Sequence, residues 1–264
     1  IGENAFMGCM VLESVILPTA LQTIGENAFM GCMVLESVIL PTALQTIGEN
    51  AFMGCMVLES VILPATLQTI GESAFYRSGL IEIDIPGSVT DIGQSAFGYC
   101  QALKTAKLSA ELQAIPNYMF SNCTSLTEIT LPATLETIGT CAFQLSGLKT
   151  IALPASVEYI DEQAFACSFD NVIFEGELPA KKGSSGETGM GNIVLNYTAF
   201  STYGVQDDPG LSRVFLPAVN TQEVAATYDA NIRTDQRPAA RIYYGYTGSG
   251  DRTDPANYTA YPVQ

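Results

Sequence analysis

The apolar positions of this chain recur with a fixed period of 22 or 23 residues. Residues 1–23 are repeated letter for letter in residues 24–46, and again in residues 47–69 except for an exchange of Thr and Ala after the proline. A degenerate further unit begins at Leu195. Self-similarity at such a period is typical of a solenoid, in which each unit stacks on the next. The same place in successive units is held by Ile1, Ile24, Ile47, Ile70, Ile92, Ile115, Ile138 and Ile160.

Within one unit, the alternation of apolar and polar residues predicts a short β-strand. Val15 and Leu17 fall on one face of an extended segment, which we expect to be the core face. Ser14 and Ile16 fall on the opposite face. Pro18 ends the strand, because it has no N–H group to donate to a neighbouring strand.

The second half of the unit predicts a compact corner. Leu21 and Ile24 point inward again, and Gly25 allows the chain to turn. Residues 26–29 predict a single turn of α- or 3₁₀-helix, in which the small side chain of Ala28 lets two backbones approach.

Every unit ends this corner with a phenylalanine, which predicts a continuous aromatic core. One strand and one short turn cannot bury their own apolar face, whereas stacked units bury it against each other. The phenylalanines at this position are Phe6, Phe29, Phe52, Phe75, Phe97, Phe120, Phe143, Phe165 and Phe200.

The pattern L-x-x-V-x-L-P-x-x-L-x-x-I-G-x-x-A-F-x-x-C resembles the leucine-rich repeat of the BspA-like, Treponema pallidum type, over about residues 1–230. The resemblance implies a right-handed superhelix with a parallel β-sheet on the concave face and short turns or 3₁₀ segments on the convex face. It also implies an extracellular or surface-anchored bacterial protein that adheres to a host or microbial partner. It offers no catalytic residue to transfer to this chain.

The repeat pattern divides the chain into two parts. Residues 1–231 form the predicted solenoid of about nine units, and residues 232–264 form an irregular, Tyr-rich cap or linker. Residues 176–192, rich in Gly and Ser, and residues 201–210 are predicted insertions between units. Residues 220–230 have apolar residues at helical spacing and predict a helix that caps the open end of the repeat array.

Composition and charge narrow the possible functions. The chain has 11 Lys and Arg against 27 Asp and Glu, for a formal net charge of −16. Such an acidic surface repels nucleic acid and anionic membranes, and no run reaches the ~18 apolar residues of a membrane span. The absence of His excludes Ser-His-Asp and Cys-His catalysis and the usual transition-metal sites. Carboxylate pairs such as Asp207 and Asp208 fall in predicted loops rather than across a cleft. We therefore predict a protein that is not an enzyme and holds no cofactor or metal.

Cysteine recurs at one position of the repeat. A disulfide framework or a zinc site is one interpretation of this pattern. The odd total of seven and the absence of both C-x-x-C and His favour a row of small, buried, reduced thiols. Ser78 and Ser146 replace Cys in the two 22-residue units. The repeat position is held by Cys9, Cys32, Cys55, Cys100 and Cys123, with Cys167 close to it and Cys141 elsewhere.

The outward strand positions vary between units while the core positions barely change, so they mark the candidate binding surface. An exposed apolar row often marks an interaction site, although a β-branched row also suits a strand. The varied face favours a binding module for a protein or glycan, whereas the near-identical first units favour a structural spacer. We favour binding. The candidate partner-binding residues are Ile16, Ile39, Ile62, Glu82, Asp84, Lys107, Glu128, Thr130, Arg213 and Phe215.

Overall fold

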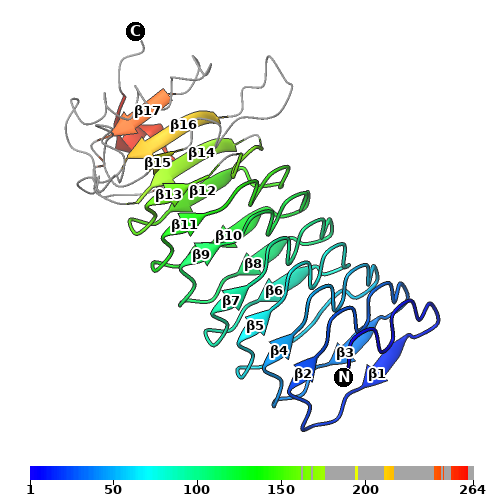
Figure 1. Cartoon of the computed structure of the whole chain (residues 1–264). Coiled ribbons are helices and arrows are strands. Elements are labelled where there is room, and N and C mark those ends of the chain that lie inside the picture. The colour runs from blue at the N-terminus through cyan, green and yellow to red at the C-terminus, as the bar shows by residue number, and fades with distance from the viewer. Residues whose placement is uncertain are drawn as a thin grey trace.

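A computed structural model describes residues 1–175 apart from 162 and 168, together with residues 194–195, 211–216, 241–244, 246 and 251–260. The described units stack into an elongated solenoid that starts from the N-terminal unit at one end (Figure 1). Each turn contributes short strands that pair in parallel with their equivalents in the neighbouring units. The predicted repeat solenoid is confirmed.

The front strands, as we call the series that contains the predicted strand, form one side of the solenoid. They are β1 (Ser14–Ile16), β3 (Ser37–Ile39), β6 (Glu82–Asp84), β8 (Thr105–Lys107), β10 (Glu128–Thr130), β12 (Thr150–Leu153), β14 (Phe169–Phe174) and β16 (Leu211–Leu216). In β3, Val38 is buried while Ser37 and Ile39 are exposed, as the alternation predicts. Their outward side is called the front face below.

A second parallel series, the return strands, was not predicted. These strands are β2 (Thr23–Ile24), β4 (Thr46–Ile47), β5 (Thr69–Ile70), β7 (Asp91–Ile92), β9 (Ala114–Ile115), β11 (Thr137–Ile138), β13 (Tyr159–Ile160) and β15 (Val194–Leu195). Two residues are too few for a period-2 pattern to show in the sequence. Stacking creates them, because the backbone N–H of Gln45 reaches the carbonyl of Gln22 one unit away at 2.8 Å.

The corner that was predicted as a helical turn is a stacked loop instead. Asn27 has a φ of 53°, which no right-handed helix contains. The N–H groups of Asn27 and Phe29 donate to Glu49 and Ala51 of the next unit, both at 2.8 Å. Within the described residues the one helical segment is a 3₁₀ turn, η1 (Pro255–Asn257), near the C-terminus.

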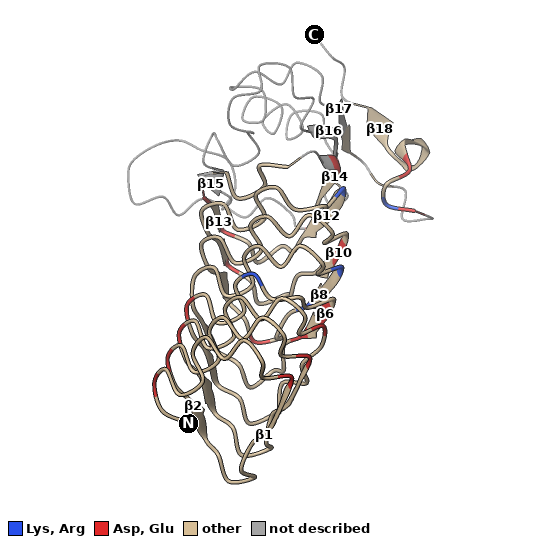
Figure 2. Ribbon diagram, turned by 90° about the vertical axis from the view of Figure 1, so that its right-hand side faces the viewer, with Lys and Arg blue, Asp and Glu red and all other residues tan. Residues whose placement is uncertain are grey.

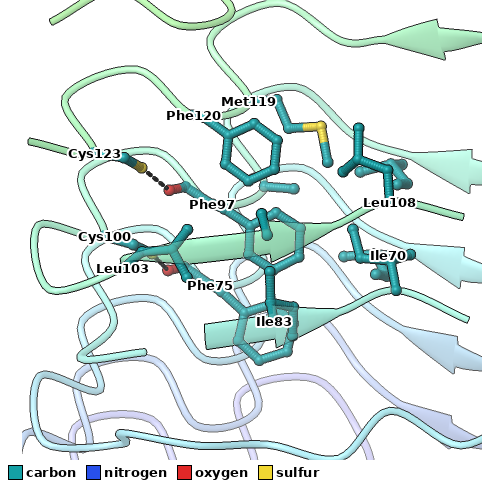
Figure 3. Packing of buried hydrophobic residues seen from close by; sticks show 14 of the residues in the cluster. Ile70, Phe75, Ile83, Phe97, Cys100, Leu103, Leu108, Met119, Phe120 and Cys123 are labelled. Carbon is teal, nitrogen blue, oxygen red and sulfur yellow. Dashed lines mark hydrogen bonds between the residues drawn. The ribbon is translucent and has the colours of Figure 1, made fainter. Parts of the chain in front are cut away.

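The phenylalanines form the continuous core that the repeat predicts (Figure 3). From Phe6 to Phe165, successive rings stack with centroids 5.1 to 5.7 Å apart and interplanar angles of 3° to 12°. Phe97 is fully buried between Phe75 and Phe120, as expected. The position of Phe200 lies outside the described residues.

The two 22-residue units interrupt the front sheet. Each lacks one residue before its strand and carries Gly there, at Gly79 and Gly147. A Cβ atom on Gly79 would lie 2.2 Å from the carbonyl oxygen of Met56, and one on Gly147 would lie 2.5 Å from that of Thr124. Any other residue would clash with the backbone of the preceding unit. The front strands are unpaired at the same places, between β3 and β6 and between β10 and β12.

The C-terminal part contains strands where an irregular chain was predicted. β17 (Arg241–Tyr244) pairs in parallel with β16 and extends the front sheet, and β18 (Thr259–Ala260) pairs antiparallel with β17. The predicted insertions at 176–192 and 201–210 lie outside the described residues. The predicted cap helix at 220–230 lies outside them as well.

Candidate binding surface

The first three units present a bare apolar row on the front face. Ile16, Ile39 and Ile62 have 95%, 78% and 86% of their surface exposed. Ile16 and Ile39 pair in register across β1 and β3, so their side chains are neighbours on the sheet. Ile62 lies at the same place in the third unit, although its segment is not a strand. This row is called the bare row below.

A shallow groove of about 1110 Å³ continues from the end of the bare row along the front face. This is the face of the sheet that is expected to be concave from the resemblance to BspA-like repeats. Four successive units line it, through residues 60–65, 82–86, 105–110 and 128–133. The structure brings six of the candidate residues together here: Ile62, Glu82, Asp84, Lys107, Glu128 and Thr130.

Sequence reasoning missed one wall of the groove, which is formed just beyond the strands. Pro86, Ala110, Pro132 and Ala133 contribute to it. The signal was present in the sequence, because these residues follow the strand at the place where the repeat has L-P-x.

The strands that line the groove carry residues of both charges (Figure 2). Lys107 Nζ lies 2.9 Å from Asp84 Oδ2, and the register places Asp84, Lys107 and Thr130 in one row across β6, β8 and β10. Both charged side chains are mostly exposed, at 73% and 65%, so the ion pair contributes little to folding. Lys107 can therefore exchange Asp84 for a group on a partner at low cost.

Two candidate residues lie elsewhere. Phe215, predicted to face a partner, is fully buried and is withdrawn from the candidate surface. It pairs in register with Ile173 on one side and Tyr243 on the other, and these three form a second hydrophobic cluster on the front face. Arg213 lies in β16 in register with Asn171, and its side chain is outside the described part of the chain.

Residues 251–260, which we call the cover segment, pack against Phe215 through Tyr258. The ring of Tyr258 packs 5.0 Å from that of Phe215 and also contacts the rings of Tyr243 and Tyr246. Arg252 forms an ion pair with Glu175, at the end of β14. Burial and the nearby Tyr246 raise the pKa of Tyr258 to about 12. The row Ile173, Phe215 and Tyr243 is called the covered row below.

The buried cysteines of the repeat are held in hydrogen bonds to the backbone. The Sγ atoms of Cys55, Cys100 and Cys123 donate to carbonyls of phenylalanines in the preceding units, at 3.1 to 3.3 Å. Burial raises the pKa of Cys55 to about 12 and that of Cys100 to about 11. Thiols with such pKa values stay protonated at neutral pH and are poor nucleophiles. All seven cysteines are free thiols in the structure.

Within the described residues, no group of three or more Cys, Asp or Glu side chains is arranged to hold a metal ion. No helix in this part of the chain is long and apolar enough to cross a membrane.

Comparison with known proteins agrees with the repeat pattern. A family described as the BspA type leucine rich repeat region matches in six copies, over residues 1–104 and 97–178. No curated protein sequence matches the chain.

Three solved structures illustrate what the chain is similar to. A leucine-rich repeat protein from Bacteroides ovatus is 27% identical with a TM-score of 0.58, and the match covers 83% of this chain and 59% of that one. The leucine rich repeat protein of T. pallidum is 33% identical with a TM-score of 0.52, over 55% of this chain and 68% of that one. A leucine rich cell surface protein from Faecalibacterium prausnitzii is 26% identical with a TM-score of 0.35, over 62% and 59%. The chain thus spans about three fifths of the length of the Bacteroides ovatus protein.

Proposed function

The chain belongs to the BspA-type leucine-rich repeat family, and on this basis we propose that it is a non-catalytic binding module of a bacterial surface protein. It holds a protein or glycan partner on its front face, outside the cell. The groove carries this proposal, because it gathers charged, polar and apolar groups from four units on one hollowed surface.

The chemistry of the groove suits recognition rather than catalysis. Glu82, Asp84, Lys107 and Glu128 are exposed on short strands that pair in one sheet, so they are held at fixed spacing without being buried. Rigid presentation of this kind lowers the entropy that a binding surface loses when a partner docks. The side chains that line the groove also differ from unit to unit, because the outward residues of β6, β8 and β10 are not the same.

A structural spacer is the second candidate function. The observation that favours it is the near-identity of residues 1–23, 24–46 and 47–69, because three copies of one face encode little shape. In that case the repeats supply length to a larger surface protein, and the front face has no ligand of its own.

A direct test compares a groove variant with a matched variant elsewhere. Ile62→Lys combined with Glu128→Lys changes the groove, while Gln45→Lys combined with Glu49→Lys makes the same change of charge on the side of the return strands. The wild-type chain and both variants are applied to an array of purified surface proteins and glycans.

The binding function predicts at least one ligand that binds the wild type and the Gln45/Glu49 variant but does not bind the Ile62/Glu128 variant. If both variants bind a ligand equally weakly, binding depends only on the overall charge of the protein, which would contradict a site in the groove. An array on which nothing binds the wild type would favour the spacer.

A further inference from the structure

We propose that the front face of the first three units binds a basic, amphipathic α-helix on the surface of a protein partner. The inference rests on the proposed binding function and names the class of partner for one part of the face. Three features of the chain support it: the charge beside the bare row, the segment that covers the other apolar row, and the spacing of the units.

The bare row is flanked by a row of acidic residues. Glu13, Glu36 and Glu59 stand at the start of the front segments, three residues before Ile16, Ile39 and Ile62, and all six side chains are exposed. The N–H of Glu36 donates to the carbonyl of Glu13 at 2.9 Å, so the acidic row is stacked like the apolar one. Residues 1–69 contain no Lys or Arg, so no cation from these units neutralises the row (Figure 2). A complementary surface must be apolar on one stripe and cationic beside it.

The chain itself shows what covers an apolar row on this face. The covered row is shielded by Tyr258, an aromatic side chain, while Arg252 of the same segment pairs with Glu175 beside the row. The cover is thus an apolar group and a cation carried on one short segment. The bare row with its acidic neighbours offers the same two kinds of contact, and in the described part of the chain nothing occupies it.

The spacing of the units favours a helix over an extended segment. Equivalent core rings in the first three units repeat at 5.1 and 5.2 Å. A helix laid along the solenoid presents one side chain per turn every about 5.4 Å, so it stays in step within about 1 Å over three units. An extended strand presents its same-side residues every about 6.7 Å and falls out of step by about 3 Å.

The distance between the bare row and the acidic row also fits a helix. Three residues of extended chain separate Ile39 from Glu36 by about 10 Å, close to the diameter of a helix with its side chains. Leu or Phe on one stripe can contact the isoleucines while Lys or Arg on the flank reaches the glutamates. An anionic membrane is repelled by the same acidic row, and a second copy of this chain carries a net charge of −16.

The probe is a labelled synthetic peptide of about 18 residues, or about five helical turns, built from Leu on one stripe and Lys elsewhere. One control peptide has the same composition with the leucines scattered around the helix, and another has Glu in place of Lys. Fluorescence anisotropy measures the binding of each to the full chain at two salt concentrations.

The protein variants are matched in pairs. Ile39→Ser removes one member of the bare row, and Leu145→Ser removes an exposed apolar side chain from a distant corner. Glu36→Gln removes one charge from the acidic row, and Glu49→Gln removes one from the side of the return strands. We expect Ile39→Ser to weaken binding about tenfold, the effect of leaving about 55 Å² of apolar surface in contact with water. Glu36→Gln should weaken it about threefold at low salt and less at high salt. Leu145→Ser and Glu49→Gln should change it less than about 1.5-fold.

Equal binding of the scattered peptide, or equal losses in Glu36→Gln and Glu49→Gln, would overturn the proposal, since either result means bulk charge attraction. Binding that is lost when 251–260 is deleted but kept in Ile39→Ser would instead assign the peptide to the C-terminal end and also overturn it. If the peptide fails while an array ligand still depends on Ile62 and Glu128, the proposed function stands and only the helix is wrong. If neither binds, both proposals fail.

Discussion

The two ends of the front face carry the same kind of apolar row, which is exposed at one end and buried at the other. In the first three units Ile16, Ile39 and Ile62 are between 78% and 95% exposed. At the C-terminal end Ile173, Phe215 and Tyr243 are between 0% and 7% exposed, although they hold the corresponding outward register on β14, β16 and β17.

The strands do not account for the difference between the rows, and the cover segment packs on only one of them. Alternation along β3 and β14 is the same, and both place an apolar side chain on the outside. Only the covered row receives Tyr258 and the ion pair of Arg252 with Glu175. An outward apolar row on this sheet is therefore covered by the chain itself at one end and exposed at the other, within the described residues.

The largest expected effect is the contrast between Phe215→Ala and Ile39→Ala. Removing the buried ring leaves a cavity and should destabilise the C-terminal strands by about 3–5 kcal/mol. Ile39→Ala removes an exposed side chain and should change stability by less than about 0.5 kcal/mol. Hydrogen exchange of residues 211–216 and 37–39 measures each locally, which suits a repeat array whose unfolding is not all-or-none. Equal protection losses at the two sites would break the comparison.

Tyr258→Ala tests whether the cover segment is held by its ring. The side chain is partly buried against Phe215, Tyr243 and Tyr246, so its loss should cost about 1–2 kcal/mol and raise exchange in β17. Tyr118→Ala is the matched control, because Tyr118 is 41% exposed on a corner of the solenoid. A change in β17 of the same size in both variants would show that the ring has no special role.

High pH should loosen the covered row and spare the bare one. Burial raises the pKa of Tyr258 to about 12, above the value of about 10 in an unfolded chain, so folding favours the neutral phenol. Its contribution is complete below about pH 10 and is lost as the pH rises towards 12. Hydrogen exchange in β17, followed with tyrosinate absorbance, should report this window. Tyr258→Phe should remove the dependence, and a window that persists in that variant would assign it to another group.

The smallest expected effect concerns the ion pair of Lys107 with Asp84, which lies between the bare row and the covered row. Lys107→Ala removes the exposed ion pair with Asp84 and should change the free energy of unfolding by less than about 0.5 kcal/mol, and by less still in high salt. Thermal melts at two salt concentrations measure this. A loss above about 1 kcal/mol would mean that the groove floor is a structural element rather than a free binding surface.

Much of the fold could be predicted from the sequence, because each unit contacts mainly its neighbours. The repeat of Ile24, Phe29 and Val38 determined which side chains are inside, and the stacking of identical units follows from one such unit. The corner at Asn27 was misjudged, since its φ is positive and the N–H groups of Asn27 and Phe29 bond to the next unit. The return strands were missed for the same reason.

For the candidate binding surface, too, local features could be predicted and tertiary contacts could not. The sequence by itself determined that Ile16, Ile39, Ile62, Asp84 and Lys107 lie outward, because strand alternation is a local property of the backbone. Only the tertiary structure decided that a groove joins four units and that Phe215 is buried. Phe215 and Tyr258 are 43 residues apart in the sequence. No local pattern relates them, because the free energy that brings the cover segment onto β16 is released only when both are already in place.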